Sequence, residues 1–186
     1  MRSSRRRVFC HTHSRGTVGF TLVELIVVIV IVGVLATLVF PVFNRVAEGG
    51  RAASCVSNLR QIGVALSVYV GEHNMTMPEL KAGRTDKKDD GPVLDTVLAA
   101  GIGDPRVFAC PSDKRGIATR SGTSYFWNSV LNNQPVANLN FFRQSDTTRI
   151  PVLSDKEGFH PYEPSQVNIL YADGHATRDL KFTTDK

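Results

Sequence analysis

The chain has 186 residues, of which 42% are hydrophobic and 21% charged, so it is neither disordered throughout nor embedded in a membrane throughout. This length suits one modest domain with an appendage. The formal net charge is +5, but five of the 22 basic residues lie within residues 1–19, which contain no acidic residue. The rest of the chain has 17 residues of each sign, and this balance argues against nucleic-acid binding.

A basic leader, residues 1–19, precedes an apolar run that covers residues 20–43 and contains Glu24 as its only charge. At a rise of about 1.5 Å per residue, a helix of this length spans a hydrocarbon core of about 30 Å. The arginines before the run orient the leader to the cytoplasm, so the chain beyond about Asn44 is exported. The sequence therefore predicts three parts: a leader (1–19), a transmembrane helix (20–43) and an exported domain (44–186).

Two simpler interpretations of this segment compete. A secretory signal peptide has an apolar core of about 7–15 residues followed by a small-residue cleavage site. Here the core is longer and runs into Pro41 without such a site. A plain signal anchor explains the length and the orientation but not Glu24, because a carboxylate near the start of a spanning helix is costly and usually has a partner or a function.

The chain contains three cysteines, Cys10, Cys55 and Cys110. Cys10 lies in the leader, so only Cys55 and Cys110 remain if the leader is removed. Two cysteines in an exported domain could form one disulfide, while the alternative makes Cys55 a small core residue on a helix. None of the spacings resembles a zinc site, which usually draws about four ligands from closely spaced pairs.

Beyond Pro41 the sequence keeps a helical period, with apolar residues every three or four positions and charged residues between them. The periodic positions are Val46, Ala52, Cys55 or Val56, Leu59, Ile62, Leu66 and Tyr69 or Val70. This pattern predicts an amphipathic continuation of the membrane helix that ends near residues 72–74. Its apolar stripe requires a partner, for which a sheet formed by the rest of the chain is the natural candidate.

The remaining chain predicts short elements. Residues 81–92 are expected to form a polar loop and 93–100 a short helix, and the expected strands are 124–131, 149–153, 167–171 and 176–182. Asp173-Gly174 between the last two strands is typical of a hairpin turn, since that turn needs positive φ. Tyr125, Phe126 and Trp127 are expected in the core. The predicted fold is α+β, with one long N-terminal helix on a small antiparallel sheet.

The run Gly19-Phe20-Thr21-Leu22-Val23-Glu24, after a basic leader and before an uncharged stretch, resembles the processing site of type IV prepilins and type II secretion pseudopilins. In that family a membrane peptidase cuts after the glycine on the cytoplasmic side and methylates the new amine. The resemblance implies cleavage between Gly19 and Phe20, methylation of Phe20, and Pro41 as a helix-kinking proline. It also implies that Glu24 pairs with the Phe20 amine of a neighbouring subunit, which would offset the cost of burying both charges. The alternative places the Glu24 carboxylate at the membrane interface near the lipid headgroups.

Further stretches resemble a bacterial subgroup of prepilin-like proteins that is abundant in planctomycetes. They are Cys55 to Gly63, the Cys110-Pro111-Ser112 step, and Asn168 to His175 with its Asp173-Gly174 step. The C-terminal pattern of that subgroup is a histidine, nine residues and then Asp-Gly. In this chain Glu163 occupies the histidine position, and the nearest preceding histidine is His160.

The chain carries a set of acids and histidines towards its C-terminus, namely Asp155, Glu157, His160, Glu163, Asp173 and His175. Oxygen ligands suit calcium, and some pseudopilins use a C-terminal calcium site, so Asp155 and Asp173 are candidate calcium ligands. The alternatives are turn-capping acids with surface histidines, or a hydrolytic metal centre of His160, Asp173 and His175. No other cofactor is expected.

The resemblance implies a structural filament subunit rather than an enzyme, in a type IV pilus or a type II secretion pseudopilus. Its expected partners are the prepilin peptidase, copies of itself or other pilin-like subunits, a secretion or pilus assembly platform and the inner membrane, with no nucleic acid. The alternative is an exported enzyme or binding domain on a pilin-like membrane anchor; a catalytic site would then have to appear as a concave cluster with perturbed acids.

Overall fold

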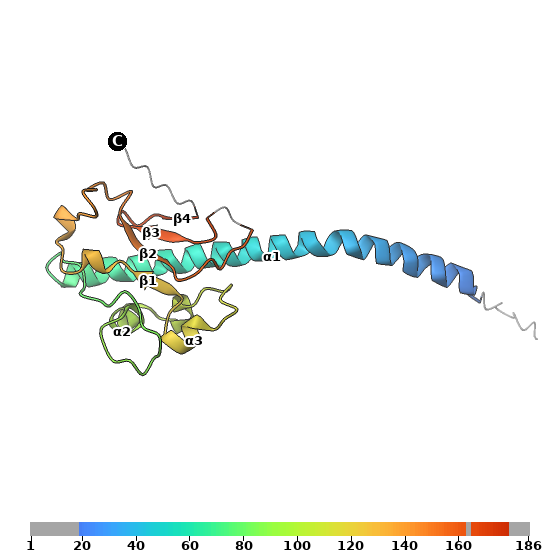
Figure 1. The fold of residues 1–186 in the computed structure, drawn as a ribbon, viewed down its shortest axis with the longest axis horizontal. Helices are drawn as coiled ribbons and strands as arrows, with labels where there is room; N and C mark the ends of the chain where they lie inside the picture. Colours follow the sequence, from blue (N-terminus) through green and yellow to red (C-terminus); the bar gives the residue numbers. More distant parts are fainter. Residues whose placement is uncertain (1–18, 163–164, 179–186) are drawn as a thin grey trace, which may run out of the picture. The chain divides into compact units, whose positions relative to one another are not determined.

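The computed structural model describes residues 19–162 and 165–178 (Figure 1). The chain divides into two compact units, Met1–Pro41 and Val42–Lys186, and the boundary falls inside helix α1 (Leu22–Glu72). Several predictions lie outside the described residues: the leader up to residue 18 with Cys10, the position of Glu163, and the end of the last predicted strand.

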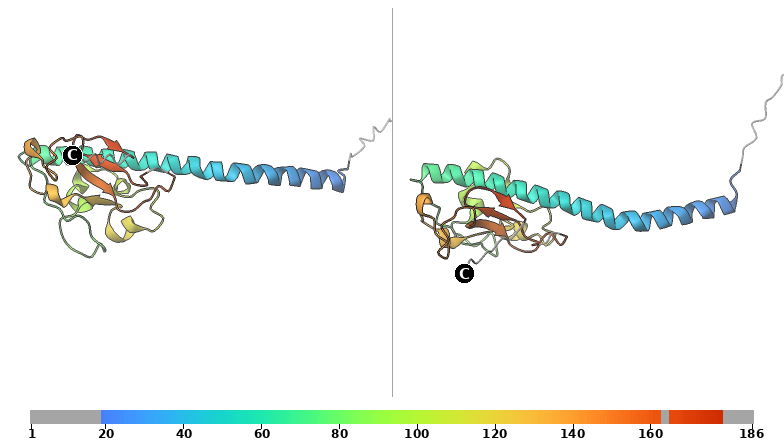
Figure 2. Two further views of the ribbon diagram at one scale, coloured as in Figure 1. Left: turned by 45° about the horizontal axis from the view of Figure 1, so that its top comes forward. Right: turned by 90° about the horizontal axis from the view of Figure 1, so that it is seen from above.

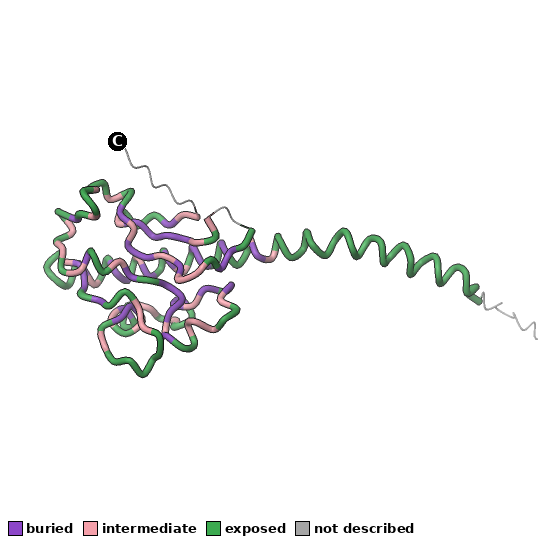
Figure 3. The backbone as a smooth tube through the Cα atoms, viewed as in Figure 1, coloured by how far each residue is buried: buried purple, intermediate pink, exposed green. Residues whose placement is uncertain are grey.

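In the first unit, every residue from Gly19 to Pro41 is exposed, as the green tube in Figure 3 shows. The most apolar stretch of α1 has a mean hydropathy of 3.1 and no buried residue. By length and composition α1 is able to cross a membrane, and it is the one such helix among the described residues. Pro41 lies inside α1 without ending it, although a proline removes one helical hydrogen bond.

In the second unit, the continuation of α1 buries one face. Its buried residues are Glu48, Ala52, Cys55, Val56, Leu59, Ile62, Ala65, Leu66 and Val70. The predicted stripe and the predicted end of the helix are confirmed, with one exception. Val46 is 70% exposed, so the buried face begins at Glu48.

A four-stranded antiparallel sheet packs on this face of α1 (Figures 1 and 2). Its strands are β1 (Tyr125–Trp127), β2 (Pro151–Asp155), β3 (Ile169–Tyr171) and β4 (Ala176–Thr177), in the order β1-β2-β3-β4. The predicted α+β arrangement is therefore confirmed.

The helix and the sheet approach closely at Gly63. A Cβ atom added to Gly63 would lie 3.1 Å from a side-chain carbon of Leu170 in β3. Leu170 pairs with Leu153 of β2 and with Ala176 of β4, and all three residues are buried. The absence of a side chain at Gly63 thus lets the centre of the sheet rest directly on the helix.

The predicted hairpin at Asp173-Gly174 is confirmed. β3 and β4 pair as antiparallel neighbours, and Gly174 has a φ of +88°. The Gly174 N–H donates to the Tyr171 carbonyl over 2.9 Å, and the Tyr171 N–H donates to the His175 carbonyl over the same distance.

Several other connections contain short helical turns. Between α1 and β1 lie α2 (Leu94–Val97), η1 (Ala99–Gly101), η2 (Pro105–Phe108) and α3 (Ile117–Ser121), and after β1 lie η3 (Ser129–Leu131) and η4 (Val136–Asn138). The helix predicted for 93–100 is thus split between α2 and η1.

The strand predicted for 124–131 is shorter than expected because Asn128 ends it. The Asn128 side chain accepts a hydrogen bond from the Val130 N–H over 3.2 Å, which caps η3. Within β1, Tyr125 and Trp127 are buried as predicted, whereas Phe126 is 44% exposed. The prediction of a core Phe126 is wrong because alternate residues of a strand face opposite sides.

Candidate functional site

The predicted cleavage site lies in exposed, irregular backbone. Gly19, Phe20 and Thr21 precede the first residue of α1, and the Phe20 side chain is 83% exposed. A peptidase needs an accessible peptide bond outside a helix, because helical hydrogen bonds would have to be broken before cleavage. The Gly19–Phe20 bond meets this requirement.

Glu24 forms a capping box with Thr21 at the start of α1. The Thr21 N–H and Thr21 Oγ1 donate to Glu24 Oε2 over 3.0 and 2.9 Å, and the Glu24 N–H donates to Thr21 Oγ1 over 3.2 Å. The reciprocal bonds satisfy two backbone donors that a helix start otherwise leaves unpaired.

The sequence interpretation missed this local role, although a threonine followed three residues later by a glutamate is its usual pattern. Capping alone gives Glu24 a structural function within its own chain. It leaves acceptor positions of the carboxylate free, because a carboxylate can accept about four hydrogen bonds in all. The same side chain can therefore cap its helix and still pair with an amine.

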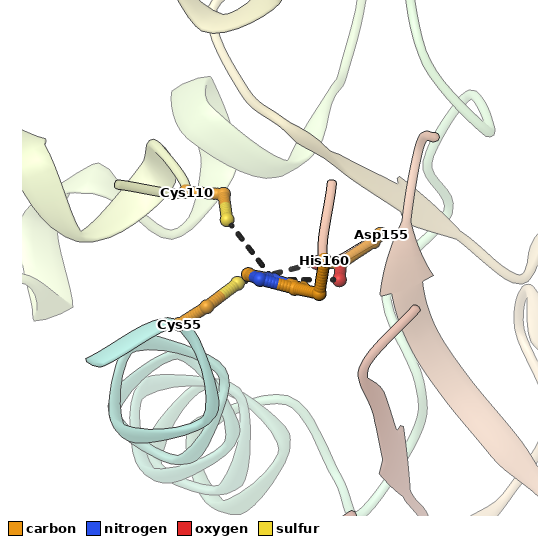
Figure 4. Close-up of side chains that lie close together, drawn as sticks. All are labelled: Cys55, Cys110, Asp155 and His160. Carbon is orange, nitrogen blue, oxygen red and sulfur yellow. Dashed lines mark hydrogen bonds and ion pairs between the residues drawn. The ribbon is translucent and has the colours of Figure 1, made fainter. Parts of the chain in front are cut away.

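A second group of functional side chains lies in the domain that follows residue 42. Figure 4 shows Cys55, Cys110, Asp155 and His160 pointing towards one another. One nitrogen, oxygen or sulfur atom from each lies within 4.8 Å of those of the other three, and all four residues are buried. Cys55 lies on α1, Cys110 follows η2, Asp155 ends β2, and His160 lies in the segment after β2.

Hydrogen bonds hold in place both Asp155, the acid of the cluster, and Glu48, an acid beside it. Asp155 Oδ2 accepts from the backbone N–H of Asn168 over 2.7 Å and from its side-chain amide over 2.9 Å. Glu48 Oε1 lies 3.2 Å from His160 Nδ1, and Glu48 Oε2 accepts from Arg51 over 2.7 Å. The Ser112 hydroxyl also donates to Glu48.

Burial shapes the electrostatics of this cluster. It raises the pKa of Asp155 to about 6, against the opposing effect of the Asn168 hydrogen bonds. Hydrogen bonding to Cys110, together with burial, raises the pKa of the Cys55 thiol. Burial opposes the charged form of His160, but interactions with Cys55, Asp155 and Glu48 outweigh it and raise the pKa.

The structure brings only part of the predicted C-terminal set together. Asp155 and His160 belong to the buried cluster, whereas Asp173 and His175 are exposed at the hairpin turn. There Asp173 Oδ1 lies 2.5 Å from His175 Nδ1 and accepts from the His175 N–H over 3.1 Å. The candidate calcium ligands Asp155 and Asp173 thus fall in different surroundings, and in the alternative hydrolytic centre His160 is separated from Asp173 and His175.

Cys55 and Cys110 are both buried free thiols in the structure, so their disulfide stays a prediction. Their convergence with His160 and Asp155 was not visible in the sequence. Asp155 and His160 are only five positions apart, but Cys55 and Cys110 lie in distant segments, and nothing in the sequence joins them to the other two residues.

Residues 19–40 match the family model described as the prokaryotic N-terminal methylation motif. No curated protein and no solved structure matches the chain. The matched residues contain the predicted cleavage bond, the capping box and most of the apolar helix. The match supports a type IV pilin-like precursor, and together with the long apolar helix it is consistent with a membrane-anchored protein.

Proposed function

We propose that the chain is a structural subunit of a type IV pilus-like or type II secretion pseudopilus filament. It is made as an inner-membrane precursor with a cytoplasmic leader, cleaved after Gly19 by a prepilin peptidase and methylated on the Phe20 amine. The observation that carries the proposal is the methylation motif at residues 19–40, placed on an exposed peptide bond and an exposed apolar helix.

The exposed surface of the helix supports assembly. Between Phe20 and Pro41, its leucine, isoleucine, valine and phenylalanine side chains are each at least 47% exposed and occur on all sides of the helix. Exposed apolar surface costs about 25 cal/mol per Å² in water, so this segment requires lipid or apolar neighbours throughout. Packing against the same segment of other subunits supplies apolar neighbours once the subunit leaves the bilayer.

The alternative, a membrane-anchored enzyme, finds its best support in Ser121 and Lys156. Both line a cavity of about 460 Å³, and Lys156 Nζ donates to Ser121 Oγ over 2.8 Å. Burial lowers the pKa of Lys156, and serine–lysine pairs occur in acyl-transfer enzymes. However, Ser121 is only 3% exposed and donates its own proton to the Ile117 carbonyl over 2.8 Å. An inaccessible hydroxyl is a poor nucleophile, which favours the subunit proposal.

The mature N-terminus tests the proposal directly. We expect mass spectrometry of the protein from its native membrane to find a chain that begins at Phe20 with a methylated amine. A Gly19→Ala variant is expected to accumulate as the uncut precursor, and a Gly33→Ala variant, within α1 and away from the cleavage bond, serves as the control. A native chain that begins at Met1, or beyond Pro41, would contradict the proposal.

A further inference from the structure

We propose that Cys55, Cys110, Asp155 and His160 form a structural binding site for zinc or a zinc-like transition-metal ion. The site lies wholly within the second unit, and the proposal does not depend on the filament function. Figure 4 shows the four side chains converging from four parts of the chain.

Three of the distances between the donor atoms suit a tetrahedral ion. Zinc lies about 2.3 Å from sulfur and about 2.0–2.1 Å from nitrogen or oxygen, so donors at tetrahedral angles stand about 3.3–3.8 Å apart. Cys55 Sγ lies 3.3 Å from Asp155 Oδ1, and Cys110 Sγ lies 3.4 Å from His160 Nε2. His160 Nε2 lies 3.5 Å from Asp155 Oδ2. Each of these three separations falls within the expected range, and the two that involve Asp155 end on different oxygens of its carboxylate. One donor atom from each residue lies within 4.8 Å of the other three, so binding an ion requires only small side-chain shifts.

The chemistry of the donors selects the class of metal. Two thiols, one imidazole and one carboxylate form a mixed sulfur, nitrogen and oxygen set, which suits zinc. Calcium and magnesium prefer six or more oxygen ligands, and this cluster offers only one carboxylate. The predicted calcium chemistry at Asp155 is therefore replaced by a zinc-type site that does not include Asp173.

The surroundings orient the ligands as metal sites usually require. A histidine that binds a metal through one ring nitrogen commonly donates from the other nitrogen to a carboxylate. His160 turns Nε2 towards Cys110 and Asp155, and its Nδ1 lies 3.2 Å from Glu48 Oε1. Glu48 is only 3% exposed and is itself held by Arg51 and Ser112. Glu48 is thus a positioning residue for His160.

Hydrogen-bond donors also face the negative charge that two thiolates and a carboxylate would bring. The Tyr125 hydroxyl lies 3.4 Å from Cys55 Sγ, and Asn168 donates twice to Asp155. Because all four ligands are buried, the ion would have no open position for a substrate and would act as a structural link. It would join α1 to the segment after η2 and to the end of β2, and its binding energy would stabilise the fold.

The test uses the full chain, purified in detergent, reduced and freed of metal with a chelator. We expect one Co²⁺ ion per chain to bind, with a thiolate-to-cobalt charge-transfer band and the visible spectrum of a tetrahedral site. One equivalent of Zn²⁺ should then displace the cobalt and raise the melting temperature. If wild-type protein with free thiols gives no thiolate–cobalt band, the proposal is overturned, and this result requires no variant.

Two matched substitutions locate the site. Cys110→Ser and His160→Gln should weaken Zn²⁺ binding by more than about 100-fold, since loss of an outer-shell partner alone costs about 10–100-fold. His175→Gln, which changes the same residue type at the exposed turn, should leave binding unchanged. Circular dichroism shows whether each variant is folded. A folded Cys110→Ser protein that retains the affinity and the charge-transfer band would overturn the proposal.

Glu48→Gln separates positioning from ligation. We expect it to weaken binding by about 10–100-fold while the thiolate–cobalt band keeps its position, because the four ligands remain. Protein isolated from cells without added reductant shows whether Cys55 and Cys110 bind a metal or form a disulfide. A Cys55–Cys110 disulfide with no bound metal would overturn the metal site and confirm the predicted disulfide instead.

Discussion

At the scale of single residues, Gly174 carries the turn of the β3–β4 hairpin. Its φ of +88° lies in the region where side chains with a Cβ atom are strained, and its N–H closes the turn on Tyr171. A Cβ atom added there would meet nothing within 4 Å. Any cost of a substitution must therefore come from the backbone conformation and not from a clash.

We expect Gly174→Ala to lower the free energy of unfolding by about 1–2 kcal/mol, the usual cost of a left-handed conformation for a residue with a side chain. Thermal unfolding of the full chain in detergent, followed through the near-ultraviolet signal of Trp127, measures the change. Gly103→Ala is the matched control, since a Cβ atom at Gly103 also meets nothing within 4 Å and its φ is not positive. Equal melting temperatures for the two variants would contradict the strained turn.

The turn that the sequence predicted and the structure confirms depends on residues that are neighbours along the chain. Asp173-Gly174 forms this turn by local backbone geometry, with a positive φ at Gly174. The buried cluster differs, because Cys55 meets Asp155 and His160 only after α1 packs on β2. Sequence spacing does not indicate that Cys55 approaches these two residues, so the cluster that we propose as a metal site was visible only in the folded domain.

At the scale of elements, Asn132 ties three segments together. Its Oδ1 accepts from Trp127 Nε1 over 2.7 Å and from the Leu80 N–H over 3.1 Å, and its Nδ2 donates to the Leu80 carbonyl over 2.9 Å. One side chain thus joins β1 to the segment that follows α1. These bonds mimic a strand pairing where no regular strand is formed.

We expect Asn132→Ala to destabilise the domain by about 2–3 kcal/mol, because it leaves several backbone and indole groups without partners in a largely buried place. Exposed Asn138→Ala should change stability by less than about 0.5 kcal/mol. Urea unfolding of the full chain in detergent measures both. If Asn132→Ala lowers the free energy of unfolding no more than Asn138→Ala does, water replaces the hydrogen bonds of Asn132 at little cost.

The sequence predicted α1 well because its apolar residues repeat over several turns. It overestimated the length of β1 because a side chain ends that strand. The stripe from Ala52 to Val70 on α1 gave a repeated pattern over several turns, and the helix ends at Glu72 as expected. β1 ends at Trp127 because Asn128 caps η3 with its side chain. Such a cap competes with strand pairing, and apolar alternation alone cannot show which arrangement is preferred.

At the scale of the whole molecule, the two units differ in whether their apolar side chains are buried or exposed to solvent. The second unit buries its apolar residues between α1 and the sheet, whereas the first unit leaves residues 19–41 exposed. The proposed function therefore assigns stability to the second unit and intermolecular packing to the first. Glu24 is the only charge in that segment, so under the proposed function it is the residue whose pairing would set the register between subunits.

The capping box offers a way to separate the two roles of Glu24. Glu24→Gln keeps an acceptor at the third helical position and removes the charge, while Glu24→Val removes both. Thr21→Val removes the hydroxyl that bonds to Glu24 and keeps the charge. We expect all three variants to be cleaved at least in part, because the Gly19–Phe20 bond remains exposed.

If Glu24 pairs with the Phe20 amine of a neighbouring subunit, the charge is what matters. We then expect both Glu24→Gln and Glu24→Val to accumulate as processed protein in the inner membrane without forming filaments, whereas Thr21→Val assembles. The measurement compares the processed fraction, from mass spectrometry, with the fraction sheared from cells or exported. Normal assembly of Glu24→Gln, with failure of Glu24→Val and Thr21→Val, would show instead that capping of the helix is the essential role. A carboxylate without a partner amine is costly in an apolar filament core, and this cost is the physical reason to expect the charge to decide.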